Sequence, residues 1–77
     1  MTNTEQKVKE IILEQKGDVE IEVDEDITKI GYNSIEFIKL VISLEKEFDI
    51  EFDDEFLDYN KLNTIQKIAE CIDNMLT

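Results

Sequence analysis

The segment DITKIGYNSIEFIKLVISLEKEF, at residues 26–48, decides the fold of this chain. It predicts a helix over residues 34–48, because Asn33 is placed to cap the helix and apolar residues then recur at helical spacing. At about 100° per residue, one group of apolar side chains shares an arc of this helix and forms a predicted core face. The members of that group are Phe37, Leu40, Val41, Leu44 and Phe48.

A second group of apolar residues on the same helix, Ile35, Ile38 and Ile42, lies outside the core arc. We call it the isoleucine stripe. It indicates either contact with another helix or an exposed docking surface, and a chain this small covers only part of each helix, which favours exposure. Ser34 lies at the edge of the stripe in the first helical turn, where free N–H groups and the helix dipole favour an anion. A serine at this place also suits a simple capping role.

Further helices are predicted on both sides of this segment. Residues 3–16 form a helix that starts with a capping box of Thr2 and Glu5 and stops at Gly17. A last helix follows Thr64 as its cap, and a short helical turn is expected near residues 54–59. The alternation of Val19, Ile21 and Val23 with acids, repeated in Ile50 and Phe52, is by itself a strand pattern. Periodicity alone therefore leaves a small α+β domain open.

Length and charge limit the functions that this chain can perform. Its 77 residues allow one domain, residues 1–77, and its net charge of -12 would repel nucleic acid and anionic membranes. Residues 17–27 carry six acids and residues 49–58 carry six more. These acids favour solubility or long-range attraction to basic patches on partner proteins. The chain shows neither a signal peptide nor a membrane span. Its one cysteine, Cys71, fits a cytoplasmic location and a place as a small buried apolar residue.

Three classes of protein can be weighed from these residues alone. An enzyme using Ser34 would need a general base, and the chain has no histidine, which leaves Asp26 or Glu36 with Lys39 as the conceivable partners. A high-affinity calcium-binding loop would need regularly spaced acids and a glutamate at the twelfth position, which neither acidic segment has. Weak binding of divalent cations by either acidic segment stays open. An acidic helical adaptor module needs neither a general base nor a metal-binding loop, so this class stays open.

Residues 26–48 resemble the acyl carrier and peptidyl carrier protein family. The family pattern is an aliphatic residue, glycine, two variable positions, a modified serine and a leucine or isoleucine, followed by an amphipathic helix that ends in acids and phenylalanine. The matching residues are Ile30, Gly31, Ser34, Ile35, Leu40, Leu44, Glu45, Glu47 and Phe48. The likeness continues through residues 53–57 and 64–65, so it covers nearly the whole chain.

The resemblance implies an all-α fold: a four-helix bundle with a long first loop over residues 18–29 and a short third helix. It implies that Ser34 receives 4′-phosphopantetheine from coenzyme A through a phosphopantetheinyl transferase, and that the chain is no enzyme. The arm would hold acyl, aminoacyl or peptidyl groups as thioesters for loading enzymes and downstream synthases with basic docking patches. The implied partner-binding residues are Asn33, Ile35, Glu36, Ile38 and Ile42. We expect a monomer without a metal ion.

Some residues depart from the pattern of fatty-acid carriers. Asn33 stands where those carriers often have aspartate, and Lys39 and Lys46 lie on a helix that is usually more uniformly acidic. The connection over residues 54–63 is also slightly longer. These departures favour a carrier for a specialised pathway of the nonribosomal peptide or polyketide type. The lack of flanking domains in the sequence favours a stand-alone carrier. A carrier for fatty-acid synthesis is the alternative within the family.

Overall fold

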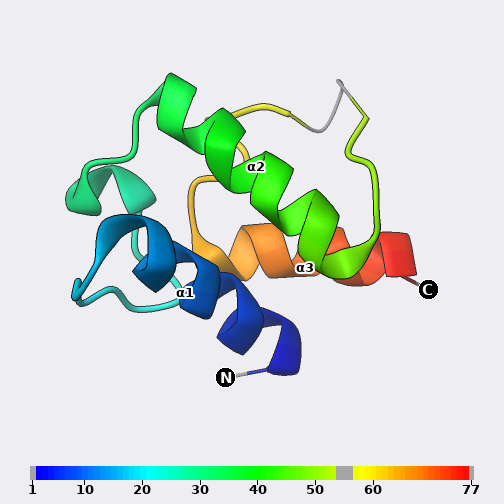
Figure 1. Ribbon diagram of the computed structural model, residues 1–77, viewed down its shortest axis with the longest axis horizontal. Helices are drawn as coiled ribbons and strands as arrows, with labels where there is room; N and C mark the ends of the chain where they lie inside the picture. The colour runs from blue at the N-terminus through cyan, green and yellow to red at the C-terminus, as the bar shows by residue number, and fades with distance from the viewer. Residues whose placement is uncertain (1, 54–56, 77) are drawn as a thin grey trace.

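Helices form the framework of the molecule, as predicted (Figure 1). The computed structural model describes residues 2–53 and 57–76. Their elements in chain order are α1 (Asn3–Lys16), the 3₁₀ helix η1 (Ile27–Ile30), α2 (Ser34–Phe48) and α3 (Ile65–Leu76). No strand occurs within these two ranges. The all-α prediction is therefore confirmed.

The helix ends follow the local signals in the sequence. At α1, the Glu5 N–H donates to Thr2 Oγ1 at 3.0 Å and the Thr2 N–H donates to Glu5 Oε1 at 2.8 Å, which completes the predicted capping box. Gly17 follows α1 with a φ of 83°. The side chains of Asn33 and Thr64 each accept the backbone N–H three residues further on, at 2.9 and 3.1 Å. All three predicted N-caps are confirmed.

The core forms where α1 packs against α2 and α3. Four of the five residues predicted for the core face of α2 are at most 4% exposed, and Phe48 is partly buried against them. The isoleucine stripe lies outside this core, with exposed fractions of 71%, 44% and 45% for Ile35, Ile38 and Ile42. The alternative of a helix packed on the stripe is excluded for the described residues. The other elements add to the core Val8, Ile11, Ile12, Ile21, Ile27, Tyr32, Phe52, Leu62, Ile65, Ile68 and Ile72.

The alternating segments are extended loops. Ile21 is 4% exposed and its apolar neighbours Val19 and Val23 pack partly against the core, while the acids between them point outward. The structure has one isolated bridge here, between Asp26 and Thr64, within the described ranges. The alternation in this protein therefore reflects burial of one side of an extended chain, and no described segment pairs with residues 18–25 as a neighbouring strand.

The predicted count of four helices is not confirmed. The described part of the chain contains three α-helices and the one-turn helix η1. Of the short helix expected near residues 54–59, positions 54–56 lie outside the described residues, and residues 57–59 form no helix. The fold still places α2 and the long first loop as the family resemblance implies.

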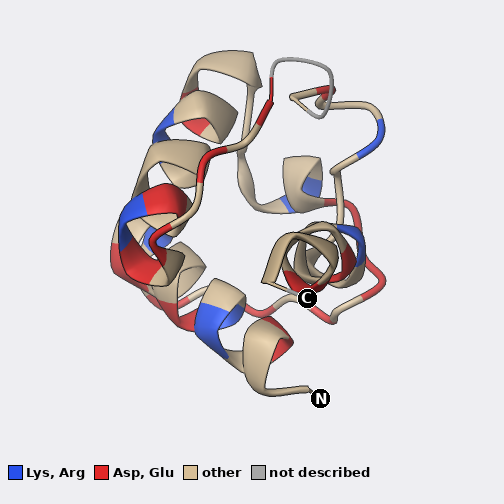
Figure 2. Cartoon of the chain, turned by 90° about the vertical axis from the view of Figure 1, so that its right-hand side faces the viewer, with Lys and Arg blue, Asp and Glu red and all other residues tan. Residues whose placement is uncertain are grey.

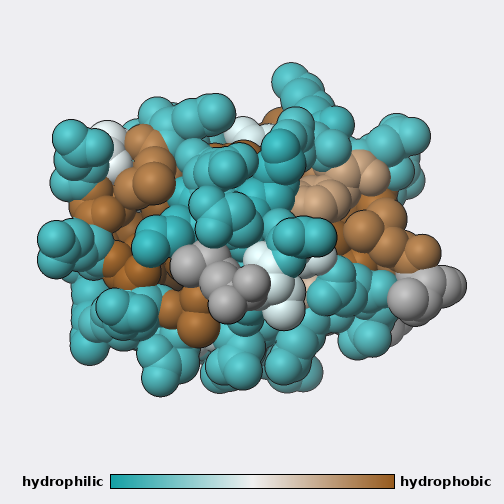
Figure 3. Space-filling view, turned by 90° about the horizontal axis from the view of Figure 1, so that it is seen from below, coloured by the Kyte–Doolittle hydropathy of each residue, from teal (hydrophilic) through white to brown (hydrophobic). Residues whose placement is uncertain are grey.

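The face of the molecule on the side of α1 is mostly polar. Seen from the side of α1, hydrophilic side chains cover most of the face, and hydrophobic residues show mainly toward its two ends (Figure 3). No helix among the described residues has the length and apolarity to cross a membrane. Cys71, predicted to be a small buried residue, is partly buried against the core, and this burial raises the pKa of its thiol.

Acidic residues gather along the first loop and along the segment that follows α2 (Figure 2). On the first loop, Glu25 pairs with Lys29 at 3.3 Å. The acids Asp18, Glu20, Glu22 and Asp24 are exposed and form no ion pair within the described residues. The folded chain therefore carries many like charges that few lysines neutralise.

This imbalance predicts that salt stabilises the protein. Moderate salt or millimolar divalent cation is expected to raise Tm, because both screen repulsion between carboxylates. For a domain of this size, about 1 kcal/mol of relieved repulsion corresponds to roughly 4–8 °C. Thermal melts followed by circular dichroism across a salt series measure the effect. A Tm that responds to neither addition would show that the acids are too dispersed to repel.

Candidate functional site

A short turn connects η1 to α2 and places Ser34 at the start of α2. Gly31 ends η1 in the left-handed region, with φ 94° and ψ 12°, and its N–H donates to the Thr28 carbonyl at 3.1 Å. A glycine adopts this conformation without the steric cost that a side chain would add. Tyr32 then enters the core at 3% exposure, and Asn33 caps α2. We call Gly31, Tyr32 and Asn33 the pre-serine turn.

Ser34 is exposed and its hydroxyl is free. It is the first residue of α2, and within the described residues its Oγ makes no hydrogen bond. The capping role belongs to Asn33, whose Oδ1 accepts the Glu36 N–H at 2.9 Å. The backbone N–H groups of Ser34 and Ile35 also have no acceptor among the described residues. A phosphate esterified to Oγ would therefore meet unpaired donors at the positive end of a helix dipole.

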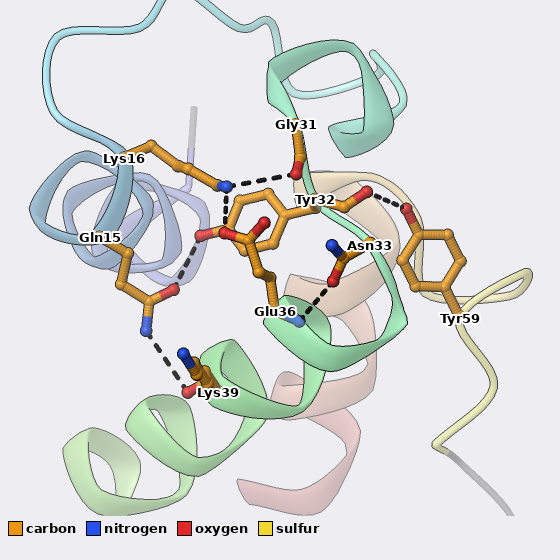
Figure 4. A network of polar contacts seen from close by, with 8 residues as sticks. All are labelled: Gln15, Lys16, Gly31, Tyr32, Asn33, Glu36, Lys39 and Tyr59. Atoms are coloured by element: carbon orange, nitrogen blue, oxygen red, sulfur yellow. Dashed lines mark hydrogen bonds and ion pairs between the residues drawn. The ribbon is translucent and has the colours of Figure 1, made fainter.

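Among the described residues, three long-range hydrogen bonds hold the pre-serine turn (Figure 4). Lys16 Nζ donates to the Gly31 carbonyl at 3.2 Å. The Tyr32 hydroxyl donates to Gln15 Oε1 at 2.8 Å, and the Tyr59 hydroxyl donates to the Tyr32 carbonyl at 2.7 Å. The end of α1 and the segment before α3 thus fix the backbone that precedes the serine from two sides.

Lys16 makes further contacts at the start of α2. Its ammonium group pairs with the Glu36 carboxylate and lies 4.8 Å from the centre of the Tyr32 ring (Figure 4). Tyr59 also packs edge-on against Phe37, with ring centres 5.3 Å apart. These contacts join α1, the pre-serine turn and α2 into one rigid support for Ser34.

The sequence analysis missed these supporting residues. Gln15, Lys16 and Tyr59 lie many positions from the serine, and nothing in their local sequence indicates contact with it. Tyr32 offered the one available signal, because a tyrosine within a short polar turn has to bury its ring and to find a partner for its hydroxyl.

The pKa of Tyr32 provides a test of this support. Burial, together with the nearby Glu36 carboxylate, raises the pKa of Tyr32 to about 12. The unfolded chain loses the phenol proton of Tyr32 near pH 10, whereas the folded chain keeps it up to about pH 12. The stability that the buried, neutral phenol contributes is therefore complete below about pH 10 and is lost as the pH rises toward 12. We expect ultraviolet titration of phenolate to show a late step that Tyr32→Phe removes. Complete phenol titration near pH 10 in the folded protein would contradict the buried position.

The residues predicted to bind partners fall into two groups. Ile35, Ile38 and Ile42 lie together on the exposed side of α2, next to Ser34. Glu36 is turned toward α1 and pairs with Lys16, while the side chain of Asn33 is used in capping. The structure thus places Ser34 beside the isoleucine stripe, whereas Glu36 lies on the side of α2 that faces α1.

Comparisons with known proteins agree with this arrangement. A family model described as "Phosphopantetheine attachment site" matches residues 6–72 of the chain. An acyl carrier protein of Buchnera aphidicola subsp. Acyrthosiphon pisum (strain 5A) is 36% identical over 77 aligned residues, which cover 96% of this chain and 94% of that protein. The family model covers α2 entirely and most of α1 and α3, so the match extends far beyond the motif around Ser34. The chain therefore belongs to the acyl and peptidyl carrier protein family, whose domain bears a phosphopantetheine attachment site.

Proposed function

We propose that Ser34 is the attachment residue and that residues 1–77 act as one carrier unit. The observation that carries the proposal is the free, exposed hydroxyl of Ser34 at the start of α2, where Asn33 already supplies the cap. An exposed hydroxyl that makes no hydrogen bond within the described residues is accessible to a transferase. The motif that suggested the serine and the geometry around it support the same residue.

The arm would supply a terminal thiol that holds an acyl, aminoacyl or peptidyl group as a thioester. The chain's own residues position it. The N–H groups of Ser34 and Ile35 have no acceptor among the described residues and would be available to the phosphate, and Lys16, Gln15 and Tyr59 keep the pre-serine turn in place. In phosphopantetheinyl transfer, the Ser34 oxygen would form a new P–O bond, the pyrophosphate bond of coenzyme A would break with adenosine 3′,5′-bisphosphate as the leaving group, and the serine proton would pass to the transferase. The chain thus serves as substrate and carrier and needs no catalytic residue.

The proposed partners are a phosphopantetheinyl transferase, loading enzymes and downstream synthases. Basic patches on these enzymes would be attracted by the net charge of -12. The isoleucine stripe would supply the apolar contact beside the arm. We further propose that the protein acts as a cytoplasmic monomer.

We favour a specialised pathway of the nonribosomal peptide or polyketide type. The support comes from Asn33 before the serine and from Lys39 and Lys46 on α2, where fatty-acid carriers more often have acids. A general acyl carrier for fatty-acid synthesis is the second candidate, and the full-length similarity to an acyl carrier protein favours it. The two candidates differ in which enzymes load the arm.

Intact mass spectrometry tests the carrier role. The purified chain is incubated with coenzyme A and a promiscuous phosphopantetheinyl transferase, and we expect the gain of one phosphopantetheine mass. The modified protein is then offered to a malonyl transferase of fatty-acid synthesis and, separately, to aminoacyl-adenylating enzymes. Rapid malonyl loading would favour the fatty-acid candidate over the specialised one. If no arm is gained, the acidic adaptor module replaces the carrier proposal.

A further inference from the structure

The acids of α2 are already engaged within the molecule. Glu36 pairs with Lys16 and Glu47 pairs with Lys7 at 2.9 Å, so both carboxylates are turned toward α1. Glu45 accepts the Phe52 N–H at 2.9 Å. Within the described residues, every glutamate of α2 therefore has a partner in its own chain. A docking enzyme would meet carboxylates that are partly neutralised.

The lysines of α2, in contrast to its glutamates, are not engaged within the described part of the molecule. Lys39 and Lys46 are exposed, and their side chains form no hydrogen bond or ion pair in the part of the chain that the structure describes. Lys46 lies in the last turn of α2, where a cation also suits the helix dipole. Lys39 lies in the middle of the helix and has no such role. Its charge is free for contacts outside the chain.

Both lysines lie directly beside the isoleucine stripe. With Ser34 at zero and about 100° per residue, the three isoleucines fall between roughly 40° and 100°, Lys46 at roughly 120° and Lys39 at roughly 140°. Glu36 and Glu47 follow at roughly 200–220°, on the side that faces α1. The edge of the stripe nearer to α1 is therefore positive.

The opposite edge of the stripe is acidic near the end of α2. Glu45 falls at roughly 20° on the same wheel, and it anchors the chain at Phe52. Glu51 and Asp53 flank Phe52 and are exposed, and Asp49 is exposed at the end of the helix. The stripe thus separates a lysine edge from an acidic edge. A partner with a uniformly basic face would be attracted to one edge and repelled at the other.

We infer that the enzyme face that docks on α2 has an apolar pocket for the isoleucine stripe and carries carboxylates opposite Lys39 and Lys46. Charge complementarity with the two unpaired lysines identifies this partner. The inference rests on the proposed carrier function and specifies the partner of the same site. Basic groups on that enzyme would contact the acidic edge on the opposite side of the isoleucine stripe and the acidic loops.

The test uses a partner of the wrong charge as its probe. The probe is a condensing enzyme of fatty-acid synthesis whose docking patch has been selected for lysines and arginines around an apolar centre. Its affinity is measured by surface plasmon resonance for the wild-type carrier with its arm and for the Lys39→Glu/Lys46→Glu double variant. The matched control is Lys9→Glu/Lys61→Glu, which changes the net charge equally at two lysines off α2 whose side chains make no hydrogen bond or ion pair in the described residues.

We expect the α2 double variant to bind this probe about five- to thirty-fold more tightly than the wild type, because two repulsive contacts become attractive ones. The control should gain about twofold or less, through long-range attraction alone. Equal gains in the two double variants would overturn the inference, since the lysines would then act only through net charge. Intact mass is recorded first for every protein. A wild-type chain that takes up no arm overturns the proposed function and this inference together, whereas a loaded chain with equal gains overturns the inference alone.

Discussion

Ser34→Ala is expected to abolish attachment of the phosphopantetheine arm completely. The variant removes the one hydroxyl at the start of α2, and no other serine lies near that helix end, since Ser43 is the second of only two serines in the chain. The fold should be unchanged, because Asn33 still caps α2 and alanine suits a helical position. Intact mass after incubation with coenzyme A and a transferase measures the loss.

Ser43→Ala is the matched control. Ser43 lies on the same helix and its Oγ accepts a hydrogen bond from Gln15 Nε2 at 3.0 Å, so this variant perturbs α2 without touching the proposed attachment oxygen. It should take up one arm as the wild type does. An arm on Ser34→Ala, or its loss from a folded Ser43→Ala, would contradict the assignment of Ser34.

Leu44→Ala is expected to lower the free energy of unfolding by about 2–5 kcal/mol. Leu44 is 1% exposed in the core arc of α2, so the change removes buried apolar atoms and leaves a cavity between the helices. Small domains have total stabilities of about 5–15 kcal/mol, and this loss is therefore a large part of the whole. Chemical denaturation followed by circular dichroism measures it.

The isoleucine stripe provides the contrasting variant on the same helix. Ile42 is 45% exposed, and Ile42→Ser should change the stability by no more than about 0.5 kcal/mol. The same variant, and Ile38→Ser beside it, should slow modification or loading, because apolar anchors are lost from the docking surface. If Ile42→Ser unfolds the domain as readily as Leu44→Ala, the stripe belongs to the core. The partner-binding residues would then need to be reassigned, while attachment at Ser34 would be unaffected.

The amino-acid sequence by itself determined the three α-helices of the described residues and the caps at their ends. Thr2, Gly17, Asn33 and Thr64 act on backbone groups a few residues away, so their effects can be predicted without knowledge of the rest of the chain. The apolar arc of α2 likewise follows from helical spacing alone. Ser34 could be selected because its motif lies within one short stretch of sequence.

The tertiary structure alone decided what the remaining patterns mean. The alternation around Ile21 became a loop because no described segment pairs with it as a strand, and periodicity contains no information about pairing partners. The support of the pre-serine turn by Gln15, Lys16 and Tyr59 depends on residues that are distant in sequence. Pairing also decides which charges of α2 are free. Lys7 and Lys16 of α1 neutralise two of its glutamates, and no local rule connects residues 20 to 40 positions apart.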